Sequence, residues 1–147
     1  MNTIVPLISS GVAGPLGVLH LPRLWQKISL DCRGKLAPGY PACCHGFDKM
    51  VIDALGLQKE AVIYYIKSNR PTYPQFEAWI KKQSGVKLDK ATIRSLNGAL
   101  TGYIFDDGTR RAILTDSGVR DDANAPRDAI NLNNLDDWNG FHDAELK

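Results

Sequence analysis

The sequence predicts a mainly α protein, a compact single-domain bundle of about five to seven short helices preceded by an extended N-terminal arm. Three observations predict this class. Apolar residues recur at helical spacing, helix-starting and helix-ending residues flank those windows, and 147 residues with 44% apolar side chains suffice for one buried core. We expect an arm at residues 1–20 and a helical core at 21–118. Residues 119–147 would be a connector and a C-terminal helix packing on the core.

The first 22 residues carry no charged side chain, which raises the question of a signal peptide or a membrane span, although a signal peptide would also need basic residues at its start. Both of these also need an uninterrupted apolar run, about 20 residues long for a span. The run is broken at Pro6, Gly11, Gly14, Pro15 and Gly17. We therefore expect an arm that lies on the domain and no membrane association.

The first two predicted helices flank a loop. Pro22 suits a first helical turn, because its missing N–H would have no partner there, and apolar residues at helical spacing continue to residue 33, before Gly34. Residues 35–46 hold two prolines and two glycines, which predicts a loop. The next helix would present apolar residues between Phe47 and Leu55 and end at Gly56.

Further helices are expected downstream. Residues 57–68 contain the apolar run 61–66, which favours a central helix, with a buried strand as the alternative. Thr72 and Gln75 have the spacing of a capping box. Asp89 would begin a longer helix, with one apolar face made of Ile93, Leu96, Leu100, Tyr103 and Ile104.

The C-terminal third is more polar. Residues 109–116 predict a short helix, and residues 120–128 predict a connector because they are polar and hold a proline. The tail, 135–146, can form a last helix. Its buried side would be made of Leu135, Trp138, His142 and Leu146.

One loop and helix start, residues 35–56, gathers most of the reactive side chains. Asp48 falls in the first turn of its helix, where the helix dipole stabilises its charge. This structural role is sufficient to explain an aspartate at this position. A carboxylate, an imidazole and a phenol at one helix start would also make a general acid–base site. The candidate catalytic residues are therefore Asp48, His45 and Tyr40.

The preceding helix supplies the candidate substrate-binding residues. Arg23 and Lys27 are four positions apart and could form a cationic edge for an anionic substrate, or simply a solvated face. Trp25 is the aromatic candidate on the same helix. The combined expectation is a small polar ligand held between this helix and the loop.

Three cysteines are too few for a disulfide framework in a chain of this length, and an odd number leaves at least one thiol free. We do not expect the adjacent Cys43 and Cys44 to bridge each other, so they are candidate reactive thiols beside a helix N-terminus, or small residues packing the loop. Their spacing with Cys32 is not that of a chelating pair, which predicts no metal site and no cofactor. A cytoplasmic location suits such cysteine usage.

The formal net charge is +2, and the basic residues are spread along the chain. This balance favours no nucleic-acid partner. A small-molecule ligand is the expected partner, and homo-oligomerisation stays open. Walker, Rossmann and Ser-His-Asp hydrolase signatures are absent from the sequence.

Short motifs stand at Leu21-Pro22-Arg23, Lys27, Gly34, Tyr40, Asp48 and Leu55-Gly56. This set resembles a bacterial family of small proteins catalogued as a domain of unknown function, and the similarity extends to about residue 100. The resemblance implies a compact helical bacterial protein and implies no activity. The chain departs from the pattern at Ser29, where the family often has arginine, and its Cys-Cys-His triplet at 43–45 lies outside the motif.

Two functions follow as hypotheses. The first is a small cofactor-independent enzyme of the lyase, isomerase or cyclase type that uses acid–base chemistry on a small polar metabolite. The alternative is a non-catalytic helical binding or protein-interaction module. A concave pocket lined by Tyr40, His45, Asp48 and an aromatic would favour the enzyme. A closed, well-packed loop with Arg23 paired to Asp48 would favour the module.

Overall fold

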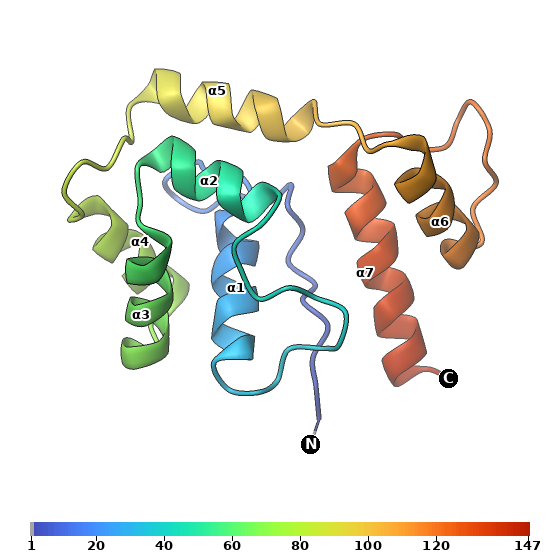
Figure 1. The fold of residues 1–147 in the computed structure, drawn as a ribbon, viewed down its shortest axis with the longest axis horizontal. Helices are drawn as coiled ribbons and strands as arrows, with labels where there is room; N and C mark the ends of the chain where they lie inside the picture. The colour runs from blue at the N-terminus through green and yellow to red at the C-terminus, as the bar shows by residue number, and fades with distance from the viewer. Residues whose placement is uncertain (1) are drawn as a thin grey trace.

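The computed structural model describes residues 2–147, and over this range the chain folds into seven α-helices (Figure 1). The helices are α1 (Leu21–Asp31), α2 (Phe47–Leu55), α3 (Lys59–Asn69), α4 (Tyr73–Lys81), α5 (Lys90–Thr101), α6 (Asp107–Ser117) and α7 (Ala129–Glu145). Within the described residues the β contacts are isolated bridges. The predicted mainly α class is confirmed, and α3 forms where a buried strand was the alternative.

Local signals fix several helix ends. The capping box that begins α4 is complete: Thr72 Oγ1 accepts from the Gln75 N–H, and the Gln75 side chain accepts from the Thr72 N–H. Asp89 caps α5 as predicted. Gly56 ends α2 with φ of 72°, a conformation that glycine adopts without a steric penalty.

Helices α1 to α5 share one apolar core. Its fully buried side chains include Leu21 and Leu24 of α1, Leu55 of α2, and Phe76 and Ile80 of α4. In Figure 1, α1 lies between the α3–α4 pair and the N-terminal arm, and α5 lies above α2 and runs alongside it. Because α1 presents one face to this core, its other face is left for polar contacts.

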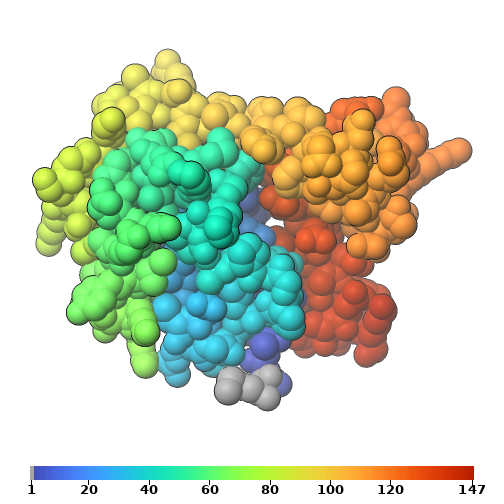
Figure 2. Space-filling view, in the orientation of Figure 1, coloured from blue at the N-terminus to red at the C-terminus, as the bar shows by residue number. Residues whose placement is uncertain are grey.

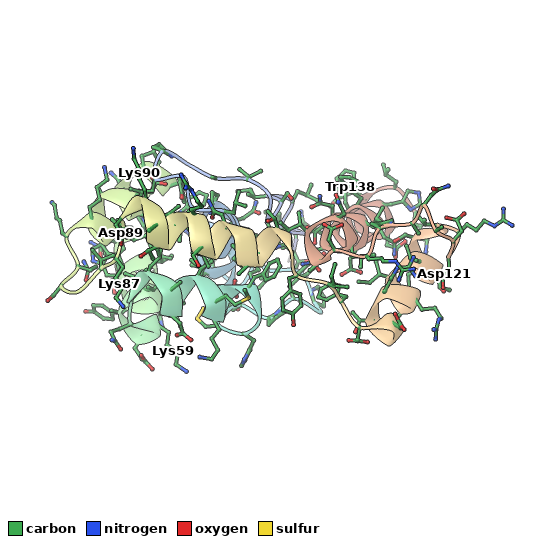
Figure 3. All side chains as sticks on the ribbon, turned by 90° about the horizontal axis from the view of Figure 1, so that it is seen from above. Lys59, Lys87, Asp89, Lys90, Asp121 and Trp138 are labelled. Atoms are coloured by element: carbon green, nitrogen blue, oxygen red, sulfur yellow. A yellow bond between two sulfur atoms is a disulfide. The ribbon has the colours of Figure 1, made fainter. Side chains whose placement is uncertain are left out.

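Helices α6 and α7 pack on each other around a separate, smaller cluster of Leu114, Ala125 and Leu132. Viewed from above, α2 and α5 lie on one side of the molecule and α6 and α7 on the other (Figure 3). The segment after α5 connects the two sides, and the surface of the loop before α2 adjoins that of α7 (Figure 2). We call the region where the α1–α5 core meets the α6–α7 cluster the junction.

The N-terminal arm is held by hydrogen bonds along its length. The Ile4 N–H donates to the Lys35 carbonyl at 2.7 Å, the Ile8 N–H donates to the Gln26 side chain at 3.0 Å, and the Leu16 N–H donates to the carboxylate of Glu77 at 3.3 Å. These hydrogen bonds hold the arm against α1, α4 and the segment after α1.

Two predicted apolar faces are only partly confirmed: Leu96 and Leu100 are buried in the main core and Leu135 packs against the smaller cluster, but the other ends of both faces are wrong. Tyr103 and Ile104 lie beyond the end of α5 and are exposed. Helix α7 starts at Ala129 because Asp128 caps it, so it is longer than predicted, and the side chains of Trp138 and Leu146 are 59% and 65% exposed. Helix α7 instead buries Leu132 in the cluster with Leu114 of α6, and it also buries Ala129 and, at the junction, a charged residue, Asp137. No helix in residues 2–147 is long and apolar enough to span a membrane.

Candidate functional site

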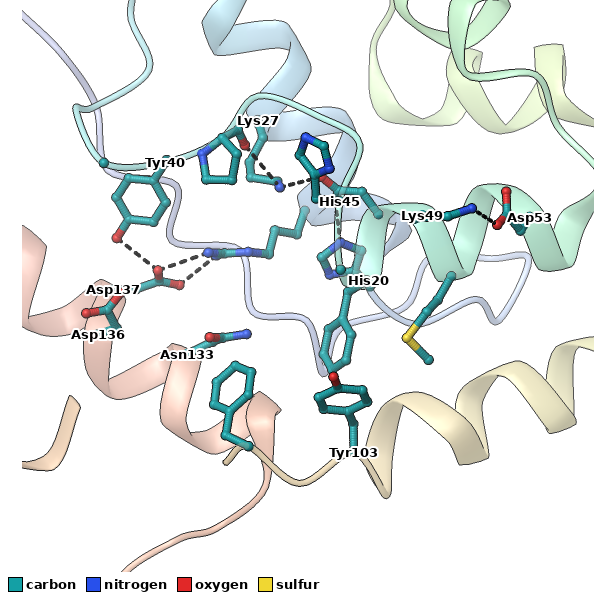
Figure 4. Close-up of a pocket in the computed structure, with 18 residues that line it drawn as sticks. His20, Lys27, Tyr40, His45, Lys49, Asp53, Tyr103, Asn133, Asp136 and Asp137 are labelled. Carbon is teal, nitrogen blue, oxygen red and sulfur yellow. Dashed lines mark hydrogen bonds and ion pairs between the residues drawn. The ribbon is translucent and has the colours of Figure 1, made fainter. Parts of the chain in front are cut away.

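A pocket of about 550 Å³ lies at the junction between the two apolar clusters (Figure 4). Five segments form it: the start of α1, the loop around Tyr40, the start of α2, the segment 103–105 and the middle of α7. This size is in the range of small-molecule sites. The loop between α1 and α2 is anchored at both ends, which places its side chains at the pocket. The Ile4–Leu36 bridge ties the beginning of the loop to the arm, and Gly46, the cap of α2, ends the loop.

Asp48 lies at the floor of the pocket and is only 1% exposed. Its Oδ2 accepts from Lys27 Nζ at 2.6 Å, and its Oδ1 accepts from His20 Nε2 at 2.6 Å. Burial disfavours the charged carboxylate, but the hydrogen bond from His20 and the charge of Lys27 outweigh it and hold the pKa of Asp48 below its ordinary value. Asp48 is therefore ionised at neutral pH, with both oxygens engaged.

His20 extends this buried chain to the arm. Its Nδ1 lies 2.8 Å from Ser10 Oγ, and both side chains are buried. A carboxylate can only accept, so Nε2 carries the proton toward Asp48 and Nδ1 accepts from the serine hydroxyl. Burial lowers the pKa of His20, against the opposing hydrogen bond to Asp48, so the imidazole is neutral at neutral pH. The residue is held in the left-handed region, with φ of 71°.

A second buried network joins α1 to α7. Arg23 donates to Asp137 through two hydrogen bonds of 2.6 and 3.0 Å, and it also donates to the carbonyls of Pro6 and Ile8. Tyr40 donates its hydroxyl to the same carboxylate at 3.0 Å, and its ring lies 5.9 Å from the guanidinium carbon. Burial, followed by repulsion from Asp137, raises the pKa of Tyr40, which keeps the phenol protonated.

One side of the pocket is aromatic. The rings of His20, Phe47, Tyr103 and Phe105 form a continuous edge-to-face series with centroid separations of 5.5, 5.6 and 6.1 Å. Edge-to-face contacts suit the quadrupoles of aromatic rings and fix their orientation. The series runs from the start of α1 across α2 to the segment before α6, so it forms a rigid apolar wall.

The part of the lining that α7 supplies is polar. Asp136, Asp137 and Asn133 border the pocket there. The Asp136 side chain is exposed at the mouth; partial burial, followed by repulsion from Asp137 and Asp116, raises its pKa. Of the described residues none forms a hydrogen bond or ion pair with the Asp136 carboxylate. It is the carboxylate best placed to meet a ligand.

The structure brings together most of the site residues that the sequence suggested. Tyr40, His45, Asp48, Arg23 and Lys27 all border the pocket. Arg23 and Lys27 are each 6% exposed, so the solvated face that was their alternative does not form. The interpretation of both as anion-binding groups is also at odds with the structure, because their hydrogen bonds go to carboxylates and carbonyls of the protein itself.

Trp25 is not part of this pocket. Its indole N–H donates to the Pro71 carbonyl at 3.0 Å, and its ring packs against Tyr73 at 5.8 Å. One helical turn separates Arg23 from Lys27, whereas Trp25 projects from another side of α1 toward α4. Its candidate role in substrate binding is corrected to a packing role.

The expectation that adjacent cysteines stay unbridged is wrong, because Cys43 and Cys44 form a disulfide. Both are half-buried and pack against the main core rather than bordering the pocket. Their interpretation as reactive thiols gives way to packing of the loop. Cys32 is free, and no group of three or more His, Cys, Asp or Glu side chains within residues 2–147 is arranged to hold a metal ion.

Sequence reasoning missed three members of the site: His20, Asp136 and Asp137. His20 directly precedes the Leu-Pro-Arg motif, and this position was the one signal that could have placed it near Asp48. The two aspartates lie in a tail whose acidic residues carried no distinguishing pattern.

Among models of protein families none matches the chain, and no curated protein sequence matches it. The resemblance to the bacterial family of unknown function therefore stays a prediction.

Proposed function

We propose that the protein is a small cofactor-independent enzyme of the lyase, isomerase or cyclase type that transfers protons on a small polar metabolite. The observation that supports this proposal is the pocket of about 550 Å³ in which Tyr40, His45 and Asp136 border one space above the buried Asp48. Side chains of three acid–base types around one concave space are what such a reaction needs.

In this proposal Asp136 is the group that exchanges a proton with the substrate. Its raised pKa makes the carboxylate a better base than an ordinary aspartate, and its oxygens have no partner among the described residues. Tyr40 stays protonated and supplies a hydroxyl close to the same space, and His45 is the exposed imidazole at the rim.

Asp48 has a different role in the proposal from the one its sequence position suggested. Because both of its oxygens are engaged and its pKa is lowered, it is a weak base. Together with Lys27 and His20 it forms a fixed polar floor that orients a bound substrate. A floor that does not reorganise during the reaction is favourable for catalysis.

The test begins with small-metabolite mixtures that contain amines, amino acids, hydroxy acids and oxo acids. Each mixture is incubated with the protein and followed by proton NMR for new products. For a metabolite that is converted, kcat should fall by about 100-fold or more in Asp136→Asn, the range seen when a general base is removed.

Asp53→Asn is the matched control, because Asp53 is an exposed carboxylate on the same pocket rim, paired with Lys49. This variant should keep the wild-type rate. Equal rates in wild type and Asp136→Asn would remove Asp136 from the mechanism, and the absence of any conversion would contradict the enzyme proposal.

One observation favours the alternative, a non-catalytic binding module. The polar atoms of Asp48, His20 and Arg23 are directed mainly at one another and at the backbone, as in a structural network. A ligand that binds in the pocket and is recovered unchanged after prolonged incubation would support this second function.

A further inference from the structure

We infer that the pocket binds a small ammonium ligand with an apolar body, and that it discriminates against anions. The inference rests on the proposed function in one respect, because it takes the same pocket to be the ligand site. It specifies the class of ligand, which the proposed reaction leaves open. Three features support it: the paired charges of the pocket, the free carboxylate of Asp136 and the aromatic wall.

The charges that border the pocket are compensated in pairs. Arg23 pairs with Asp137, Lys27 with Asp48, and Lys49 with Asp53. Asp136 is the remaining charged side chain of the lining, apart from the histidines, and within residues 2–147 it has no ion-pair partner. The pocket therefore presents one uncompensated negative charge, at its mouth.

An anionic ligand would find no free cation at the floor. Nη1 of Arg23 lies within hydrogen-bond distance of two carbonyls and a carboxylate oxygen, and Nη2 faces the other carboxylate oxygen. Lys27 Nζ is held by Asp48 at 2.6 Å and by the Pro41 carbonyl at 3.3 Å. To bind either cation, an anion would have to displace a buried carboxylate from its partner, which is costly.

The aromatic wall suits the rest of an ammonium ligand. Phe47, Tyr103 and Phe105 line the pocket with aromatic rings, of which Figure 4 labels Tyr103, and Met50 adds a flexible apolar side chain. Aromatic faces attract ammonium groups and pack against apolar bodies. A ligand spanning the pocket can therefore contact Asp136 with its charge and the rings with its hydrocarbon part.

Three matched probes test the charge preference: 3-phenylpropylamine, 3-phenylpropanol and 4-phenylbutyrate. They share one apolar body and differ only in the terminal group. Each is titrated at neutral pH to about 10 mM, and binding is followed through amide shifts in nitrogen–proton NMR spectra. The amine should bind about tenfold tighter than the carboxylate, with the alcohol between them. The shifts should centre on the segment 103–105, the start of α2 and the middle of α7.

Two variants assign the effect to its source. Asp136→Asn keeps the shape of the side chain and should remove most of the preference for the amine. Glu145→Gln, a control at an exposed carboxylate on the same helix but outside the pocket lining, should leave the order of the three affinities unchanged. Raising the salt concentration from about 50 to about 500 mM should narrow the difference between amine and carboxylate in the wild type.

The inference is overturned if the carboxylate binds as tightly as the amine, if Asp136→Asn leaves the preference intact, or if none of the probes shifts pocket resonances. Its failure is distinguishable from that of the proposed function. Conversion of a metabolite that has no amine would support the enzyme proposal and contradict the preference for an ammonium ligand. Selective amine binding without any conversion would support the ammonium preference and contradict the enzyme proposal.

Discussion

Arg23 on α1 and Asp137 on α7 are 114 positions apart in the chain, yet their side chains form two hydrogen bonds of 2.6 and 3.0 Å. Both side chains are buried, and the same guanidinium also holds the arm through two carbonyls. The α6–α7 pair has its own apolar cluster. This ion pair is therefore a principal polar link between that pair and the rest of the molecule, and it closes one side of the pocket.

Breaking this link should destabilise the protein strongly. Asp137→Asn leaves the Arg23 guanidinium buried without its counter-charge, and losing one member of a buried pair costs about 3–5 kcal/mol. The free energy of unfolding, measured by urea denaturation followed by circular dichroism, should fall by that amount. Lys49→Ala removes an exposed pair with Asp53 and should change stability by less than about 0.5 kcal/mol. Similar losses in the two variants would contradict the structural importance of the Arg23–Asp137 pair.

Asp48→Asn should also destabilise the fold, because it leaves Lys27 buried beside a neutral amide. The expected loss is again about 3–5 kcal/mol. The double variant Asp48→Asn/Lys27→Met leaves no buried charge unpaired. Its loss of unfolding free energy should therefore be smaller than the sum of the two single losses, by about 1–3 kcal/mol. A double-mutant cycle in urea measures this coupling. Strict additivity would show that the two groups do not act as a pair.

Acid should weaken the fold in two stages. Because the folded-state pKa of His20 lies below the ordinary 6.5, the unfolded chain takes up its proton first, and stability declines as the pH falls from about 6.5 toward the folded value. Asp48, whose pKa is below 3.8, contributes stability that is complete above that value and is lost as the pH falls through the lowered folded pKa. Urea midpoints measured from pH 8 down to about pH 2 should show the first decline and at least the beginning of the second.

His20→Gln identifies the first stage. Glutamine can donate to Asp48 and accept from Ser10 without titrating, so the decline that begins near pH 6.5 should flatten in this variant. His142→Gln is the control, because His142 is exposed on α7, and its profile should follow the wild type. An unchanged slope in His20→Gln would assign the decline to other groups.

Much of the fold could be predicted because it depends on neighbours in sequence. The Thr72 capping box, the Asp89 cap and the Gly56 stop each act within a few residues, so the sequence itself contains the whole interaction. The start of α7 was missed although its cap, Asp128, is equally local, because its apolar pattern is weak: its buried positions include Asp137. A carboxylate on a buried face contradicts the periodicity that identifies helices.

The candidate site was only partly predictable for a related reason. Asp48 and Tyr40 could be identified because they lie close together in the sequence at the start of α2, and Arg23 because Lys27 follows it at helical spacing in α1. Their partners, His20 and Asp137, are defined by pairings across 28 and 114 positions. Those pairings depend on how α2 and α7 pack against α1, which no local pattern encodes. The assignment of Arg23 to an anionic ligand failed because its counter-charge comes from the far end of the chain.

The capping box offers a test of a purely local contribution. Thr72→Ala removes the hydroxyl that accepts from the Gln75 N–H at the start of α4, and loss of such a cap typically costs about 1 kcal/mol. Thr115→Ala places alanine at an exposed position inside α6, where the higher helix propensity of alanine should raise stability by a few tenths of a kcal/mol. The two substitutions change the same atoms, so opposite signs in urea denaturation would isolate the capping effect. A loss of the same size in both variants would instead attribute it to the removal of a threonine side chain in general.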